Sequence, residues 1–281
     1  MLFQTIHTGN MSSIIQLNES AFLRLGNLPI RDQCNTGILV TKDGIVLIDF
    51  PKQEPADEII SETESLFHKK VTHIFFTHAH GDHRNGLAGL VGEEILLLCS
   101  KAGAEELKSC YPRLSSQIQA LNNGKAVTVG GMHFHMNIPP KLPAHSPWDM
   151  LISCEEYHLL FMGDFLNPPD TLYFHSSNYQ NWVSSLSAMW DSFSSRLLIP
   201  GHGLPWTREE SSVSFRYIAD LGKIFEALQE KGICESSISK VSDLFRLLPQ
   251  ERKRLHSLEC AAGQHMLRQL REMAQASAQS F

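Results

Sequence analysis

The strongest constraint on the fold is the alternation of apolar runs with helical periodicity in the first half of the chain. Residues 36–49, TGILVTKDGIVLID, hold two β-rich runs joined through Asp43 and Gly44, a pair that favours a hairpin because glycine tolerates a positive φ. Residues 56–70 then place apolar side chains at helical spacing, and residues 71–77, VTHIFFT, are typical of a buried strand. Strand, helix and strand in this order predict a βαβ unit and an α/β fold.

The rest of the chain divides into a mixed region and a helical end. Residues 125–164 have the pattern of an antiparallel sheet, and residues 165–180 form a long aromatic connection of the kind that is usually functional. From Thr207 onward the pattern is helical, with helices expected over residues 207–232, 236–248 and 250–276. We therefore predict a domain over residues 1–210 and a C-terminal helical extension over residues 211–281.

Composition excludes several classes of function. The 281 residues are 42% hydrophobic and 19% charged with a net charge of -6, which suits a globular protein and argues against nucleic acid or anionic membrane as partner. There is no basic, apolar leader and no run of ~18 apolar residues, so we expect a cytoplasmic protein. The six cysteines lack CxxC spacing and are expected to be reduced and mostly buried.

A cluster of titratable residues follows the predicted strand at 71–77. Residues 77–86, THAHGDHRNG, contain His78, His80, Asp82 and His83, and the tight turn at Gly81 can direct them to a shared point. Neutral imidazole and carboxylate groups are ligands for zinc, iron or manganese. A solvated histidine-rich loop is the alternative interpretation of the motif alone.

Three later residues favour the metal site over that alternative. His145 precedes a predicted strand, Asp164 ends one, and His202 follows one in the loop PGHG. Strand ends and their adjacent loops are the usual place for sites in α/β folds.

These residues resemble the metallo-β-lactamase-fold superfamily of metallohydrolases. Its HxHxDH signature matches residues 78–83, and its later His, bridging Asp and final His match His145, Asp164 and His202. The resemblance covers roughly residues 30–210. It implies an αββα sandwich of two mixed β-sheets with helices outside and the metals at one edge; the residue patterns by themselves indicate only mixed α/β.

The resemblance also implies two divalent metal ions, with zinc expected and iron or manganese as alternatives. Such ions lie about 3.5 to 4 Å apart and share a hydroxide with a lowered pKa, which attacks a carbonyl or phosphoryl centre. Asp82 and His83 are assigned as catalytic residues as well as ligands. The full ligand set is His78, His80 and His145 on one ion, Asp82, His83 and His202 on the other, and Asp164 bridging both.

This ligand set implies a hydrolase that cleaves an ester, thioester, lactone or phosphodiester bond of a small molecule. The zinc β-lactamases of the superfamily lack the bridging aspartate, so Asp164 argues against antibiotic hydrolysis. Two alternatives stay open: a mononuclear iron oxygenase of the same fold acting on persulfides, and a non-catalytic metal-binding protein. A homodimer formed through the helical extension is one option for its assembly.

Other residues near the motifs have two interpretations each. Asp49 either orients a metal-binding imidazole or simply ends its strand. Trp148 either shapes the mouth of the pocket or packs against a neighbouring loop. Arg84 either meets an anionic substrate or lies on the surface.

The long connection and a second histidine pair are similarly open. Tyr173, Phe174 and His175 either wall a substrate cleft or anchor their own loop. His133 and His135 alternate on a predicted strand, where solvent-facing positions are the favoured interpretation over a ligand pair.

Overall fold

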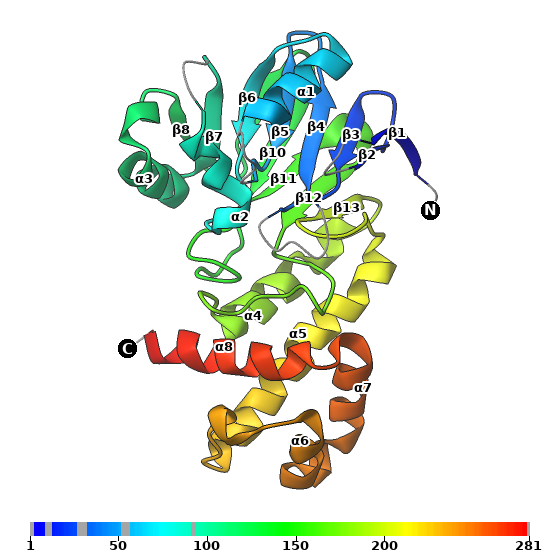
Figure 1. The fold of residues 1–281 in the computed structure, drawn as a ribbon, viewed down its shortest axis with the longest axis vertical. Helices are drawn as coiled ribbons and strands as arrows, with labels where there is room; N and C mark the ends of the chain where they lie inside the picture. Colours follow the sequence, from blue (N-terminus) through cyan, green and yellow to red (C-terminus); the bar gives the residue numbers. More distant parts are fainter. Residues whose placement is uncertain (1–2, 9–12, 27–32, 52–56, 91–93, 280–281) are drawn as a thin grey trace.

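The structure is a computed structural model that describes residues 3–8, 13–26, 33–51, 57–90 and 94–279. Two β-sheets of eight and five strands occupy one end of an elongated molecule, and the C-terminal helices form the other end (Figure 1). The predicted α/β class, with two mixed sheets, outer helices and a helical C-terminal extension, is confirmed.

The eight-stranded sheet contains the predicted βαβ unit. Its first five strands are antiparallel neighbours, and its last four are parallel neighbours. The predicted hairpin pairs β4 with β5 and turns at Gly44, where φ is +154°. In spatial order the strands are β1 (Gln4–Thr8), β2 (Ser13–Gln16), β3 (Ala21–Arg24), β4 (Thr36–Val40), β5 (Ile45–Ile48), β6 (Val71–Phe75), β7 (Leu96–Ser100) and β8 (Ile118–Leu121).

The five-stranded sheet comes from the region predicted to be antiparallel, with one strand added from later in the chain. All its neighbours are antiparallel except β12 and β13, which are parallel. In spatial order the strands are β13 (Leu197–Pro200), β12 (Leu159–Gly163), β11 (Leu151–Cys154), β10 (Met132–Asn137) and β9 (Ala126–Val129).

The helices lie on the outer faces of the sheets and in the C-terminal lobe. The single helix predicted over residues 250–276 is wrong, because Gly263 adopts a φ of +53° and separates α7 from α8. Helix α5 spans the predicted domain boundary at residue 210, and the division into two domains stays a prediction. The helices are α1 (Asp57–Phe67), α2 (Gly81–Arg84), α3 (Lys101–Cys110), α4 (Tyr179–Met189), α5 (Arg208–Glu230), α6 (Val241–Leu247), α7 (Arg252–Ala262) and α8 (His265–Gln279).

Short 3₁₀ helices complete the described structure. They are Asn85–Ala88, Pro112–Leu114, Glu155–Tyr157, Trp190–Phe193, Glu235–Ser237 and Pro249–Glu251.

Three apolar clusters hold the layers together. One lies between the two sheets, where the rings of Phe75 on β6 and Phe134 on β10 have centroids 5.3 Å apart. A second lies between the first sheet and the helices α1 and α3. The third joins the second sheet to α4, α5 and the helical lobe, and includes the fully buried Trp182. The C-terminal helices therefore share a continuous core with the second sheet.

Two of the parallel strand pairs, β5 with β6 and β12 with β13, bring four carboxyl ends to one edge of the sandwich. At this edge the two sheets are joined by a bridge between His78 and Asp149 and by the Met150 N–H, which donates to the Thr77 carbonyl at 2.7 Å. The sheets are also joined between β4 and β13, where Nδ2 of Asn35, the residue before β4, donates to the Pro200 carbonyl at 2.9 Å. The fold thus gathers residues from distant parts of the sequence at one place.

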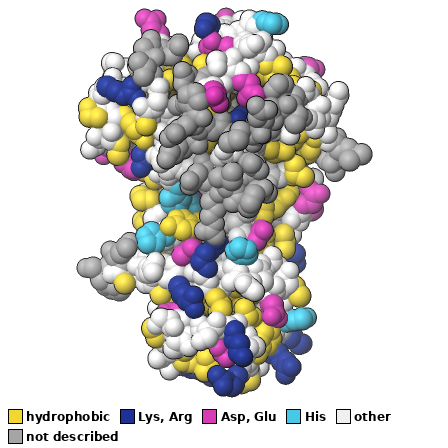
Figure 2. Space-filling model, viewed as in Figure 1, with side chains coloured by type: hydrophobic (Ala, Val, Ile, Leu, Met, Phe, Trp, Pro, Cys, Tyr) yellow, Lys and Arg dark blue, Asp and Glu magenta, His cyan; other side chains and the backbone are white. Residues whose placement is uncertain are grey.

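The surface is consistent with the modest net charge. In the view of Figure 2, Lys and Arg side chains gather mainly over the lower end of the molecule, where α6 and α7 lie, and acidic side chains are interspersed among them. None of the helices in the described ranges is long and apolar enough to cross a membrane. The six cysteines are free, as expected, but three are exposed, so the expectation that most are buried is wrong: Cys110, Cys234 and Cys260.

Candidate metal centre

The histidine-rich turn runs from the end of β6 into the short helix α2, which contains Asp82 and His83. His78 and His83 are buried, with exposed fractions of 1% and 0%, whereas His80 and Asp82 are half-buried. The turn therefore directs two imidazoles into the edge of the sandwich and leaves two side chains on a more accessible side.

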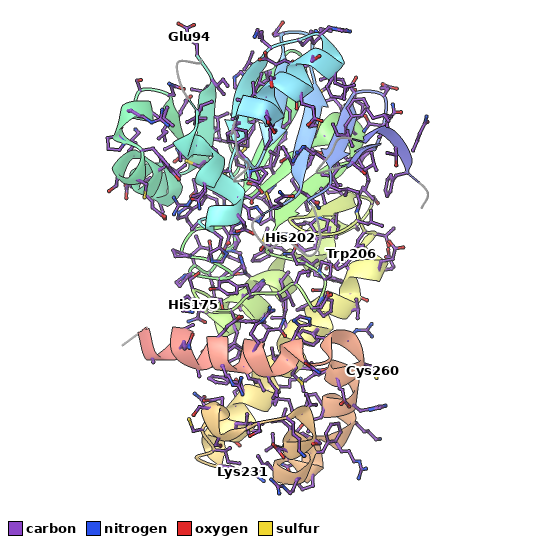
Figure 3. The ribbon with its side chains drawn as sticks, in the orientation of Figure 1. Glu94, His175, His202, Trp206, Lys231 and Cys260 are labelled. Atoms are coloured by element: carbon purple, nitrogen blue, oxygen red, sulfur yellow. The ribbon has the colours of Figure 1, made fainter. Side chains whose placement is uncertain are left out.

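The three later residues reach the same place from the second sheet. His145 lies in the loop before β11, Asp164 follows β12 and His202 follows β13, and all three are buried. Figure 3 shows His202 at the waist of the molecule, between the sheets and α8.

The structure brings all seven predicted ligands together in two groups that share one carboxylate. Within each group, one ligand atom of every residue lies within 4.8 Å of those of the others. The first group is His78, His80, His145 and Asp164, and the second is Asp82, His83, Asp164 and His202. A third set with this spacing shares His83 with the second group and also contains Cys34 and Asp49.

Contacts within the groups are close. His145 Nε2 lies 2.9 Å from His80 Nδ1 and 3.8 Å from Asp164 Oδ2. In the second group, His202 Nε2 lies 3.1 Å from Asp82 Oδ2 and 3.6 Å from Asp164 Oδ2, and His83 Nε2 lies 3.1 Å from Asp164 Oδ1. Imidazole nitrogens and carboxylate oxygens that follow different strands therefore converge on two neighbouring points.

Several of these atoms are buried without a hydrogen bond of normal geometry to any part of the chain that the structure describes. They include His78 Nε2, His83 Nε2 and Asp164 Oδ1. A buried polar atom without a partner is costly, and such atoms in a native structure commonly mark a site for an ion or a water molecule. The donor set of imidazole and carboxylate groups fits a borderline divalent cation such as zinc.

The outward-facing nitrogens of three imidazoles do have partners. His78 Nδ1 lies 3.0 Å from Thr77 Oγ1, His83 Nδ1 lies 2.7 Å from Asp49 Oδ2, and His80 Nε2 lies 2.6 Å from Ser176 Oγ. Metal-binding histidines typically use their second nitrogen in this way, because the outer contact sets the tautomer and the ring orientation.

Asp49 is the most connected of these outer partners. Its carboxylate accepts hydrogen bonds from the Thr77 N–H at 2.8 Å and the Thr77 hydroxyl at 2.7 Å, in addition to its contact with His83. Its φ is +63°, a left-handed conformation that aspartate tolerates better than most residues. The interpretation of Asp49 as the residue that orients an imidazole agrees with this geometry.

The electrostatics of the two groups differ. Burial, reinforced by His80, lowers the pKa of His145 to about 3, and burial holds the pKa of His78 well below its usual range. Burial also disfavours the charged form of His202, but the Asp164 carboxylate outweighs it and raises the pKa of His202 to about 9. The first group thus favours neutral imidazoles, the form that binds metals, and the second favours positive charge beside its carboxylates.

Gly201 leaves room for the shared carboxylate. A Cβ at this position would lie 2.1 Å from Asp164 Oδ1 and 2.7 Å from His83 Cε1. The close approach of β13 to β12 therefore requires a residue without a side chain here.

We expect Gly201→Ala to weaken metal binding by at least the 10- to 100-fold that is typical when an outer partner of a ligand is lost. The added methyl group must displace either Asp164 or the His83 ring. Metal content after dialysis measures the effect. Gly232→Ala is the control for a loss of stability alone, because its φ of +63° strains an alanine but a Cβ there meets nothing within 4 Å. Full metal content in the Gly201→Ala protein would contradict this role.

Two other predicted neighbours do not face the centre. Trp148 is 1% exposed and packs in the core beneath α3, where its Nε1 donates to Glu106 at 2.7 Å. It therefore packs and does not shape a pocket mouth. Arg84 pairs with the same Glu106 at 2.7 Å and donates to the Ala79 carbonyl, so it braces the histidine-rich turn.

The long connection after Asp164 does contact the centre. The Tyr173 ring lies edge-on to His80 with centroids 5.4 Å apart, and it stacks with His175, whereas Phe174 is fully buried against Trp182. Phe174 therefore anchors the loop, and Tyr173 lies beside a candidate ligand; a substrate cleft walled by this loop stays a prediction. Sequence reasoning missed Ser176, because a serine in a loop carries no signal of the histidine it will meet.

His133 and His135 lie outside both groups. His133 is exposed and pairs with Glu156, at 2.5 Å between Nδ1 and Oε1, and His135 is half-buried on the same strand β10. The favoured interpretation of solvent-facing positions agrees with the exposure of His133.

Comparison with known proteins places this site in a family. The model of the metallo-beta-lactamase superfamily matches residues 29–202, and the chain belongs to this superfamily. Its fold and its His and Asp clusters are those of a superfamily of metal-dependent hydrolases.

Relatives by sequence include two kinds of hydrolase. Metallo-beta-lactamase IND-1 of Chryseobacterium indologenes is 25% identical over 60% of this chain and 71% of its own length. Metallo-beta-lactamase type 2 of Bacillus cereus is 27% identical over 70% of this chain and 78% of its own. Atrochrysone carboxyl ACP thioesterase of Aspergillus terreus is 27% identical over 60% of this chain and 49% of its own.

Solved structures agree on the fold. A metallo-beta-lactamase from Pontibacter korlensis has a TM-score of 0.65 at 15% identity and covers 74% of this chain and 99% of its own. Metallo-beta-lactamase IND-7 has a TM-score of 0.61 at 20% identity and covers 74% and 99%.

Proposed function

We propose that this protein is a binuclear metal-dependent hydrolase of small-molecule esters, thioesters, lactones or phosphodiesters. The observation that carries the proposal is the pair of ligand groups that share Asp164, with buried ligand atoms that lack hydrogen-bond partners among the described residues. His78, His80 and His145 would hold one cation, Asp82, His83 and His202 the other, and Asp164 both. Two divalent cations supply an activated hydroxide and polarise the oxygen of the bond to be cleaved.

The residues of the chain contribute position and charge balance. Within the second group, Asp164 and Asp82 place negative charge beside His83, and Asp49 holds the His83 ring by its outer nitrogen. The half-buried His80 and Asp82 lie on the accessible side, so substrate is expected to approach there. Water adds to the acyl carbon or phosphorus, the bond to sulfur or oxygen breaks, and the leaving group takes a proton.

The named relatives bear on the kind of bond that we propose is cleaved. A relative named as a thioesterase supports the thioester arm of the proposal. The relatives named as β-lactamases make a β-lactam the competing substrate class. The carboxylate of Asp164 argues against a β-lactam. We also propose zinc as the metal, a cytoplasmic location and a small-molecule substrate without nucleic acid or membrane partners; a homodimer through the helical extension stays a prediction.

The test combines metal analysis with a substrate panel. We expect about two zinc or other divalent ions per chain, with turnover of at least one thioester, lactone, ester or phosphodiester. One redox-active iron per chain with oxygen uptake on a persulfide would replace the proposal with the oxygenase. Preferential turnover of a β-lactam would overturn the substrate assignment, and bound metal without turnover of any substrate would favour the non-catalytic alternative.

A further inference from the structure

Ser176 occupies the outer side of His80, one of the proposed ligands. Its Oγ lies 2.6 Å from His80 Nε2, while His80 Nδ1 faces His145 in the first ligand group. A serine hydroxyl can accept a hydrogen bond from an Nε2–H, which leaves the lone pair of the ring on Nδ1, directed at the centre. The serine contact therefore suits the tautomer that coordination through Nδ1 needs.

The loop that carries Ser176 is held from below by helix α8. The Phe174 N–H donates to Glu272 Oε2 at 3.0 Å, two residues before Ser176. Gln269 Nε2 donates to the carbonyls of Pro169 and Leu172 at 2.8 and 3.0 Å.

These α8 side chains are buried. Gln269 is 0% exposed and Glu272 is 8% exposed, and the Tyr217 hydroxyl of α5 donates to Gln269 Oε1 at 2.5 Å. Buried polar groups with several partners fix a single geometry, because breaking one contact leaves the others unsatisfied. Figure 1 shows α8 crossing directly beneath this loop and α4, and Figure 3 shows the loop residue His175 beside α8.

We propose that Ser176 is the positioning residue of His80 and that Glu272 acts through the loop to hold Ser176 in place. The C-terminal helix is then part of the metal centre, although it contributes no ligand. This inference rests on the metal binding in the proposed function but on no particular reaction.

The first experiment measures zinc affinity by competition with a chromophoric chelator. We expect Ser176→Ala to bind the zinc of the first ligand group about 10- to 100-fold less tightly, and Ser176→Thr, which keeps the hydroxyl, to stay close to the parent protein. Ser187→Ala, an exposed serine on α4, is the matched control. In the metal-free protein, the ¹⁵N shifts of His80 should report a loss of the Nε2–H tautomer in Ser176→Ala only.

The second experiment tests the connection to α8 by a double-mutant cycle. Glu272→Ala should weaken zinc binding by about 10-fold, and Glu272→Gln should restore it because the amide oxygen can still accept from Phe174. If Glu272 acts through Ser176, adding Glu272→Ala to Ser176→Ala should cause no further loss. Exposed Glu259→Ala on α7 is the control for charge and helix propensity.

Outcomes separate this inference from the proposed function. Unchanged zinc affinity and unchanged His80 shifts in Ser176→Ala would overturn the inference while leaving the hydrolase proposal intact. Additive losses in the double variant would overturn the role of Glu272 alone. Two bound zinc ions without hydrolysis of any substrate would remove the proposed function while leaving the zinc-affinity result valid. If Glu272→Ala does not fold, Ser176→Ala still decides the role of Ser176. Gln269→Ala, which removes the contacts with Pro169 and Leu172, then tests the connection to α8: parent-like zinc affinity in that variant would overturn it.

Discussion

Asp164→Ala is expected to lose at least one of the two proposed cations and to lower kcat/KM on any hydrolysed substrate by more than about 100-fold. Asp164 is the only residue common to both ligand groups within the described part of the chain, and it is 4% exposed. Its removal takes an anionic ligand from both positions and leaves His83 and His202 without one of the carboxylates that balance their charge. Metal analysis and steady-state kinetics on the same preparation measure both effects.

The matched control for this variant is Asp170→Ala, which removes an exposed carboxylate from the loop that follows Asp164. Its metal content and kinetics should equal those of the parent protein. His83→Ala should behave like Asp164→Ala, because His83 belongs to the second group. Two bound cations and parent-like rates in both Asp164→Ala and His83→Ala would disprove the ligand assignment.

Removal of the metals is expected to destabilise the fold substantially. A ligand present at about 1,000 times its Kd stabilises the folded state by about 4 kcal/mol, which for a chain of this size corresponds to a fall in Tm of roughly 10 °C on removal. The physical reason is that His78 Nε2 is buried and lacks a hydrogen-bond partner among the described residues, so a cation satisfies a group that the chain does not. Thermal unfolding with and without a chelator measures the shift.

Addition of zinc in excess over the chelator should restore the original Tm, which shows that the loss was reversible. Asp164→Ala should respond less to the chelator, since it has fewer cations to lose. An identical Tm for the metal-loaded and chelator-treated parent protein would show that the groups are satisfied without a metal.

Local patterns in the sequence account for the parts of the fold that depend on neighbouring residues. The hairpin at Gly44, the βαβ unit and the antiparallel second sheet follow from turn chemistry and hydrophobic periodicity. The strands β1 to β3 and β8 were not predicted; each has only four or five residues. The break at Gly263 was missed because the apolar periodicity continues on both sides of it.

The candidate site divides in the same way. The ligand types and their order along the chain are visible in the sequence, and the resemblance divides them into the two groups that the structure brings together around Asp164. Their role as ligands stays a prediction. Trp148 shows the limit of this reasoning: it follows a ligand loop closely in sequence, yet it turns away into the core to meet Glu106. The direction of a side chain on a loop is set by the core it packs against, which sequence spacing does not reveal.

By itself, therefore, the sequence determined the α/β class, the seven candidate ligands and the kind of chemistry that imidazole and carboxylate groups can support. Only the tertiary structure decided which residues hold those ligands in place. Ser176 contacts His80 across 96 positions of the chain, and Glu272 contacts Phe174 across 98. Such partners carry no local signature, because a hydrogen bond between distant segments depends on how whole layers pack and not on the residues beside it.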